Sequence, residues 1–207
     1  MPVKRLAAAK SRLAATFSPE QRAHFSALMC ADVLAALAVA TRVQGVTVVG
    51  SDPLVADLAR EHGAEFMPRP ADAGYSVDAT AAIEVLAGRG SAPIAVLPAD
   101  VPQVAPAELD ALAAAAVTAG CGIVLVPALI DGGTNGLVFA PPLPIPLCFG
   151  PQSFAGHCQA ATARGIAIHT AELPGLQRDI DRPEDVRWLA ARKRGGRAWA
   201  WVRRASG

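Results

Sequence analysis

The sequence predicts an α/β fold in which a mainly parallel sheet is covered by helices on both faces. Short apolar runs, at residues 46–49, 94–97 and 123–126, are bounded by glycine or proline, as buried strands are. Between these runs lie longer stretches whose apolar residues recur at helical spacing. Strands and helices that alternate in this way form a sheet whose connections are helices.

The first half of the chain opens with a well-marked helix. Ser18 is a favourable N-cap, Pro19 suits the first helical position and Gln21 completes a capping box, so we expect a helix to about residue 40. The β-branched run 46–49 is expected to be a strand that ends at Gly50. The remaining elements expected in this half are a helix over 53–62, a short strand at 66–67, a loop over 68–74, a helix over 76–87 and a fully buried strand over 94–97.

The second half continues the alternation. A helix closed by Gly120 is followed by two strands, and a proline-rich stretch marks a surface loop or an edge strand. The expected elements are a helix over 106–119, strands over 123–126 and 134–139, a loop over 141–146, a helix over 153–164, a strand over 166–169, a turn at 174–175 and a final helix from Pro183.

Length and charge indicate one domain with a small appendage. The chain has 207 residues, 52% of them hydrophobic, and a net charge of +1, which does not suggest a polyanion or polycation binder. Six cations and no acid lie from Arg192 onward. We expect a domain over residues 1–193 and a basic tail over 194–207 that is solvated or packs against another subunit, rather than contacting nucleic acid or membrane.

The cysteines and the N-terminus favour a cytoplasmic protein. No CxxC spacing occurs, so the cysteines are expected to be small core residues rather than zinc ligands or disulfides. The N-terminal residues lack a signal-peptide pattern, and no stretch approaches the ~20 clean apolar residues of a membrane span. The cysteines are Cys30, Cys121, Cys148 and Cys158.

Three aspartates could form a metal site. Asp100 follows the strand 94–97, where ligands of parallel sheets bind. Asp179 and Asp181, two apart in an extended segment, would point to the same side. Magnesium usually takes one or two carboxylates together with substrate phosphates. The alternatives are that Asp100 only forms a turn and that Asp181 only caps the final helix.

Three further segments could bind anions. Residues 132–135 begin with two glycines, which allow a close backbone approach. Residues 150–153 begin a helix, whose N-terminus suits a phosphate or a carboxylate. Residues 4–12 carry four cations and are either a solvated helix start or a phosphate-binding loop. Together they suggest a site for more than one phosphate.

The ordered set of motifs resembles the 2-phospho-L-lactate guanylyltransferase family of coenzyme F420 biosynthesis, called CofC or, in mycobacteria, FbiD. The matching stretches keep the family's order almost to residue 190. They are 2–4 with 9–13, 97–100, 133–135, 149–157 and 173–176 with 179–185. Where family members commonly have Gly-Leu-Asn, this chain has Gly74-Tyr75-Ser76.

The resemblance implies a single-domain, Rossmann-like, glycosyltransferase-A-type nucleotidyltransferase with a mainly parallel, mixed sheet. Such an enzyme would transfer GMP from GTP to 2-phospho-L-lactate, phosphoenolpyruvate or 3-phosphoglycerate and release pyrophosphate. Its cofactor would be Mg²⁺. The next transferase of F420 synthesis would be a partner, and a homodimer stays open.

The resemblance also assigns roles residue by residue. Asp100, Lys10 and Arg12 would be catalytic, and Asp100, Asp179 and Asp181 would hold the magnesium. The remaining roles are phospho-acid binding by Thr134, Gly150 and Ser153, and nucleotide binding by Lys4, Pro98, Ala99 and Gly74.

Two rival functions remain. A related molybdopterin-type or sugar-phosphate-type nucleotidyltransferase would prefer CTP or UTP, or would carry a glycine-rich loop that residues 4–12 lack. A non-catalytic relative would show no magnesium-dependent turnover. Retention of all three aspartates argues against the non-catalytic relative.

Overall fold

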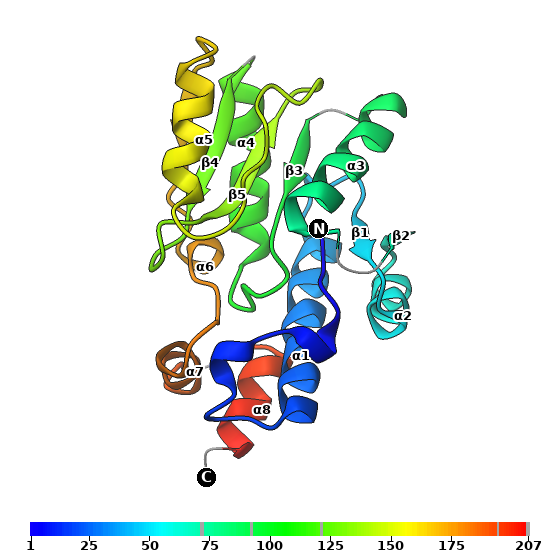
Figure 1. The fold of residues 1–207 in the computed structure, drawn as a ribbon, viewed down its shortest axis with the longest axis vertical. Coiled ribbons are helices and arrows are strands. Elements are labelled where there is room, and N and C mark those ends of the chain that lie inside the picture. The colour runs from blue at the N-terminus through cyan, green and yellow to red at the C-terminus, as the bar shows by residue number, and fades with distance from the viewer. Residues whose placement is uncertain (71–72, 92, 121, 194, 206–207) are drawn as a thin grey trace.

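The computed structural model describes residues 1–70, 73–91, 93–120, 122–193 and 195–205. The helices are α1 (Pro19–Val39), α2 (Pro53–Glu61), α3 (Tyr75–Gly88), α4 (Pro106–Ala119), α5 (Ser153–Thr162), α6 (Pro174–Gln177), α7 (Pro183–Ala190) and α8 (Arg197–Ala205), with 3-10 turns η1 (Leu6–Ala8) and η2 (Ser11–Leu13). The strands are β1 (Thr47–Gly50), β2 (Glu65–Pro68), β3 (Ile94–Val96), β4 (Ile123–Pro127), β5 (Thr134–Phe139) and β6 (Ile168–Thr170) (Figure 1).

The strands form two sheets. The larger has the order β3-β5-β4-β6, and the smaller pairs β1 with β2 in parallel. In the larger sheet β4 and β6 are parallel, whereas β5 runs antiparallel to both β3 and β4. Three of its four strands therefore share one direction. The predicted α/β fold with a mainly parallel, mixed sheet is confirmed.

Strand β3 differs from the expectation of a fully buried strand. It lies at the edge of the larger sheet, and Ala95 is exposed between the buried Ile94 and Val96. The fully buried strand is β5, which is paired on both sides. Its first residues, Thr134-Asn135-Gly136, resemble a turn in sequence, so the sequence did not indicate that this strand lies inside the sheet.

Helices cover both faces of the larger sheet, because its strands bury both sides. On β4, Val124 and Val126 face the cluster that includes α1 and α4 residues, while Ile123 and Leu125 face the cluster that includes α3 and α5 residues. A strand that is buried on both faces is continuously apolar, as this one is.

Helix α1 begins where the sequence predicts. The Ser18 hydroxyl accepts from Gln21 N–H, and the Gln21 side chain accepts from Ser18 N–H. Among the described helices, α1 alone is long and apolar enough to cross a membrane by length and composition. Within the fold, however, 56% of its most apolar window is buried, as expected of a core helix.

The basic C-terminal segment is part of the core, not a solvated tail. Helix α8 packs on α1 (Figure 1), where the rings of Phe25 and Trp201 stack at 5.4 Å. The Asp32 carboxylate accepts the N–H groups of Arg197 (2.7 Å) and Ala198 (2.9 Å) and so caps α8. The cations of this segment gave no sign of the apolar face beside them. Arg194 and residues 206–207 lie outside the described residues.

The cysteines are only partly core residues. Cys30 is buried and Cys158 is half-buried, but Cys148 is exposed in the loop before α5. Cys121 lies outside the described residues.

The N-terminal residues pair with β1. Val3 N–H donates to Val49 O at 2.8 Å, and Val49 N–H donates to Met1 O at 3.0 Å. The N-terminal amino group donates to Thr47 O, and burial lowers its pKa to about 5. This pairing fixes the start of the basic stretch 4–12 beside the smaller sheet.

Gly50 permits that close approach. A Cβ at this position would lie 2.6 Å from the Val3 carbonyl oxygen, a backbone atom that cannot rotate away. We expect Gly50→Ala to lower the free energy of unfolding by about 1–3 kcal/mol, as overpacking does. Urea denaturation measures this change.

Gly45→Ala is the matched control, since nothing lies within 4 Å of its added Cβ. It should be neutral or slightly stabilising, because alanine restricts the unfolded chain. Equal stability of the two variants would contradict the pairing of Val3 with β1.

Candidate active site

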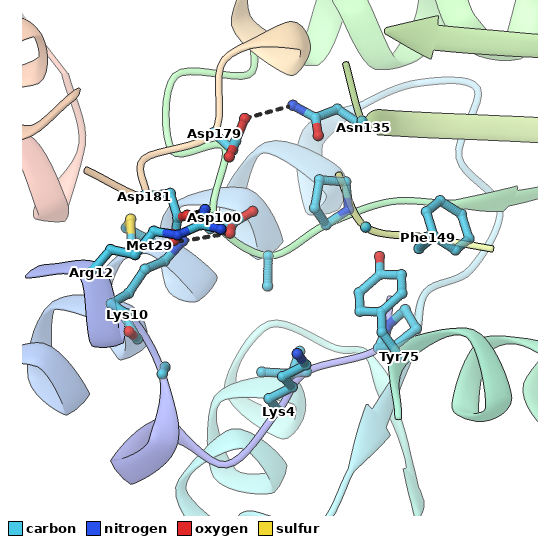
Figure 2. Close-up of a pocket in the computed structure, with 18 of the residues that line it drawn as sticks. Lys4, Lys10, Arg12, Met29, Tyr75, Asp100, Asn135, Phe149, Asp179 and Asp181 are labelled. Carbon is cyan, nitrogen blue, oxygen red and sulfur yellow. Dashed lines mark hydrogen bonds and ion pairs between the residues drawn. The ribbon is translucent and has the colours of Figure 1, made fainter. Parts of the chain in front are cut away.

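A cavity of about 450 Å³ opens where seven segments of the chain meet. It is lined by the N-terminal stretch, α1, the start of α3, the loop after β3, the start of β5 with the turn before it, the loop before α5 and the segment before α7. Figure 2 shows the three aspartates with Lys10 and Arg12 on one side and the rings of Tyr75 and Phe149 on the other, with Lys4 apart from the aspartates. The lining residues in these segments include Lys4, Lys10, Arg12, Pro98, Ala99, Asp100, Gly133, Thr134, Asn135, Phe149, Gly150, Asp179 and Asp181.

The backbone brings the three aspartates to one cavity. Ile180 N–H donates to Asp100 O at 3.0 Å, which holds the segment before α7 against the loop after β3. The Ile180 side chain is fully buried, so its neighbours Asp179 and Asp181 are on the other side of the segment, facing the cavity.

Lys10 connects the basic stretch to the aspartates. Its Nζ donates to Asp100 Oδ2 at 2.6 Å and lies 3.5 Å from Asp181 Oδ1, while Arg12 pairs with the other Asp181 oxygen. Burial lowers the pKa of Lys10, but Asp100 and Asp181 outweigh it and raise the pKa above its usual value. Lys10 is therefore charged at pH 7. The alternative of a solvated helix start is wrong for this residue, whose side chain is only 7% exposed.

The loop that carries Lys10 and Arg12 is anchored in the hydrophobic core by the residues that follow it. Leu13 and Phe17 are buried in the cluster between α1, α7 and α8. Lys10 itself has a left-handed backbone, with φ of 56°, an arrangement that is uncommon outside glycine. Tertiary packing therefore holds this turn, and the sequence alone does not mark it.

Asp179 is a half-buried carboxylate. It accepts from Asn135 Nδ2 at 3.2 Å (Figure 2). Burial and the nearby Asp100 raise its pKa above the usual value. The negative charge that Asp100 and Asp179 bring to this end of the cavity is suited to neutralisation by a cation.

Within the described residues, no group of three or more metal-binding side chains is arranged to hold an ion. The Lys10 ammonium lies between Asp100 and Asp181, so the predicted three-carboxylate site is not preassembled. The donor chemistry still suits magnesium, which needs oxygen ligands and accepts one or two carboxylates when phosphates complete its shell.

A polar corner of the cavity is built on β5 and α5. Ser153 Oγ lies 3.2 Å from Thr134 Oγ1, and His157 Nδ1 lies 2.9 Å from the same oxygen. Thr134 and Gly150 line the cavity, while Ser153 is buried behind Thr134. Nearby, Gly133 N–H donates to Asp131 Oδ1 and shapes the turn before β5.

Most predicted site residues line the cavity, and two do not. Ser153 is buried and contacts Thr134, and Gly74 caps α3 just outside the lining, next to Tyr75. Two further residues line the cavity that no sequence motif marks. The Tyr75 hydroxyl donates to Leu97 O, and the buried Ser26 hydroxyl has no partner among the described residues. Both occur in helices with apolar patterns, which gave no signal of a site.

Comparison with protein families gives one match over nearly the whole chain. Residues 1–205 match the model of the family described as "Guanylyl transferase CofC like". A phosphoenolpyruvate guanylyltransferase of Conexibacter woesei is 35% identical over 96% of this chain and 90% of its own length. One of Rubrobacter xylanophilus is 37% identical over 92% of both chains. A 3-phospho-D-glycerate guanylyltransferase of Phenylobacterium zucineum is 36% identical over 86% of this chain and 82% of its own length.

Comparison with solved structures supports the fold. A putative nucleotide-diphospho-sugar transferase from Desulfovibrio desulfuricans superposes with a TM-score of 0.82 at 13% identity, covering 99% of this chain and 93% of that one. At this identity the likeness concerns the arrangement of strands and helices, not the substrate.

Proposed function

Because the chain belongs to the CofC-like guanylyl transferase family, we propose that it transfers GMP from GTP to the phosphate of a three-carbon phospho-acid. Relatives named as phosphoenolpyruvate and 3-phospho-D-glycerate guanylyltransferases support this substrate class. The observation that carries the proposal is the single cavity that joins a charged end, around Lys10 and Asp100, to a polar corner at Thr134.

The reaction joins two anions. An oxygen of the acid's phosphate attacks the α-phosphorus of GTP, and the bond from that phosphorus to the β-phosphate oxygen breaks. Pyrophosphate leaves with the electron pair, and GMP and the phospho-acid are joined by a new P–O–P bond. The substrate phosphate is itself the nucleophile, so catalysis is positioning and neutralisation of charge.

The charged end suits the triphosphate. Lys10 and Arg12 provide two cations whose positions are fixed by Asp100 and Asp181. When the nucleotide enters, its phosphates would take over part of the pairing with Lys10 and Arg12, and Asp100 and Asp181 would then be free to hold a cation. Lys4, Pro98 and Ala99 line the adjoining wall and are proposed to contact the nucleoside.

The polar corner suits the phospho-acid. Thr134 brings a hydroxyl to the cavity. Gly150 has a φ of 141°, a backbone conformation that favours glycine, and its lack of a side chain leaves the backbone accessible from the cavity. Ser153 supports Thr134 from behind.

Magnesium is the proposed cofactor. Asp100 and Asp179, with Asp181, would hold it. When bound, it would neutralise charge on the phosphates and align them.

The wider setting is also proposed. The product would enter coenzyme F420 biosynthesis and pass to the next transferase of that pathway, in the cytoplasm. A homodimer is compatible with this role.

The function is tested by pyrophosphate release. Purified protein with GTP and Mg²⁺ should release pyrophosphate only when 2-phospho-L-lactate, phosphoenolpyruvate or 3-phosphoglycerate is added, and EDTA should stop it. The assay includes the next transferase so that product is removed. No release with any of the three acids, or equal rates with CTP or UTP, would overturn the proposal.

A further inference from the structure

His157 is a fully buried histidine directly behind the polar corner of the cavity. It is on α5, and its ring meets that of Phe149 edge-on at 5.1 Å. Its two nitrogens have different partners. Nε2 lies 3.1 Å from Cys148 N, and Nδ1 lies 2.9 Å from Thr134 Oγ1.

The Cys148 amide fixes which nitrogen carries the proton. A backbone N–H can only donate, so Nε2 must accept and therefore carries no proton. In a neutral imidazole the proton is then on Nδ1, which donates to Thr134 Oγ1. If Nε2 carried a proton, its N–H would face the N–H of Cys148, and neither donor would have an acceptor. Burial also lowers the pKa of His157, which keeps the ring neutral at pH 7.

This tautomer determines what Thr134 can do. Thr134 and Ser153 have two hydroxyl protons between them, and the hydrogen bond that joins them uses one. Because His157 donates to Thr134 rather than accepting from it, the second proton stays uncommitted. The Ser153 hydroxyl donates to Thr134 Oγ1, so the proton that remains available is that of the Thr134 hydroxyl. Thr134 is the member of the pair that lines the cavity.

We infer that His157 is a positioning residue that orients the Thr134 hydroxyl as a donor to the phospho-acid. The chain of donors runs from Cys148 N–H through His157 to Thr134 and ends at the anion. A hydrogen bond to a charged oxygen is about twice as strong as a neutral one, so the orientation matters for binding. The inference rests on the proposed function for the identity of the anion, but not for the tautomer.

The tautomer is tested directly by ¹⁵N NMR of the histidine rings at pH 7, with the signal assigned by its loss in His157→Phe. We expect the neutral form protonated on Nδ1. A signal for the Nε2-protonated form, or for imidazolium, would overturn the inference. This readout needs no substrate, so it stands even if GMP transfer is not observed.

The role is tested by kinetics. His157→Phe keeps the ring volume and should raise the KM for the phospho-acid about tenfold, which corresponds to ~1.4 kcal/mol, with the KM for GTP within about twofold. His157→Asn places an amide N–H₂ near the position of the histidine Nδ1, so its KM for the phospho-acid should lie between those of the wild type and of His157→Phe.

A double-mutant cycle separates positioning from packing. Thr134→Val removes the hydroxyl, so adding His157→Phe to it should cause no further rise in the KM for the phospho-acid. An equal further rise in the double variant would show that His157 acts through packing alone and would overturn the inference.

Discussion

Replacing Asp100 with asparagine should slow GMP transfer about 1000-fold, which corresponds to ~4 kcal/mol of transition-state stabilisation. The asparagine oxygen can still accept from Lys10, whose Nζ is 2.6 Å from Asp100 Oδ2. What is lost is the negative charge that offsets Lys10 and, in the proposed mechanism, helps to hold magnesium. Loss of one electrostatic group at a reacting phosphate has effects of this order.

The measurement is kcat for pyrophosphate release across a magnesium titration. Raising the magnesium concentration should recover only part of the rate, because the charge itself is missing. Asp57→Asn is the matched control, since Asp57 pairs with Arg60 on the surface of α2, and its kcat should stay unchanged. A variant of Asp100 with full activity would rule out the assigned role.

Phe25→Ala should lower the free energy of unfolding by about 3–5 kcal/mol. Phe25 is fully buried on α1. The centroid of its ring lies 5.7 Å from that of Phe17 and 5.4 Å from that of Trp201. Its removal leaves a cavity where α1 meets α8. Because Phe17 follows the loop that carries Lys10, we also expect a higher KM for GTP.

Urea denaturation measures the first effect and steady-state kinetics the second. Val39→Ala in the same helix is the control, because Val39 is 65% exposed, and its effect should stay within about 0.5 kcal/mol. Similar stability losses in both variants would contradict the packing of α8 on α1.

Local patterns predicted most of the fold and the charged part of the site. The capping box at Ser18 and the apolar run at Ile123 specify their elements without help from distant residues. Asp179 and Asp181 were found because alternation in an extended segment is a local rule. The position of Asp100 after a strand predicted that it would lie beside them.

The parts that could not be predicted depend on distant contacts. The left-handed Lys10 and its ion pair with Asp100 join residues 90 positions apart. The placement of α8 depends on Asp32, and the edge position of β3 depends on how β5 pairs. None of these has a periodicity or a motif that a single sequence reveals.

The contact between α1 and α8 has a consequence during translation. Asp32 and Arg197 are 165 residues apart, and ribosomes add ~5–20 residues per second, so α1 is made roughly 8–33 s before the helix that its Asp32 caps. Throughout that time a helix with the composition of a membrane span emerges without the aromatic cover of Trp201. We therefore expect the loop that carries Lys10 to reach its final form only after α8 has been synthesised, because Phe17, which follows that loop, packs on Trp201.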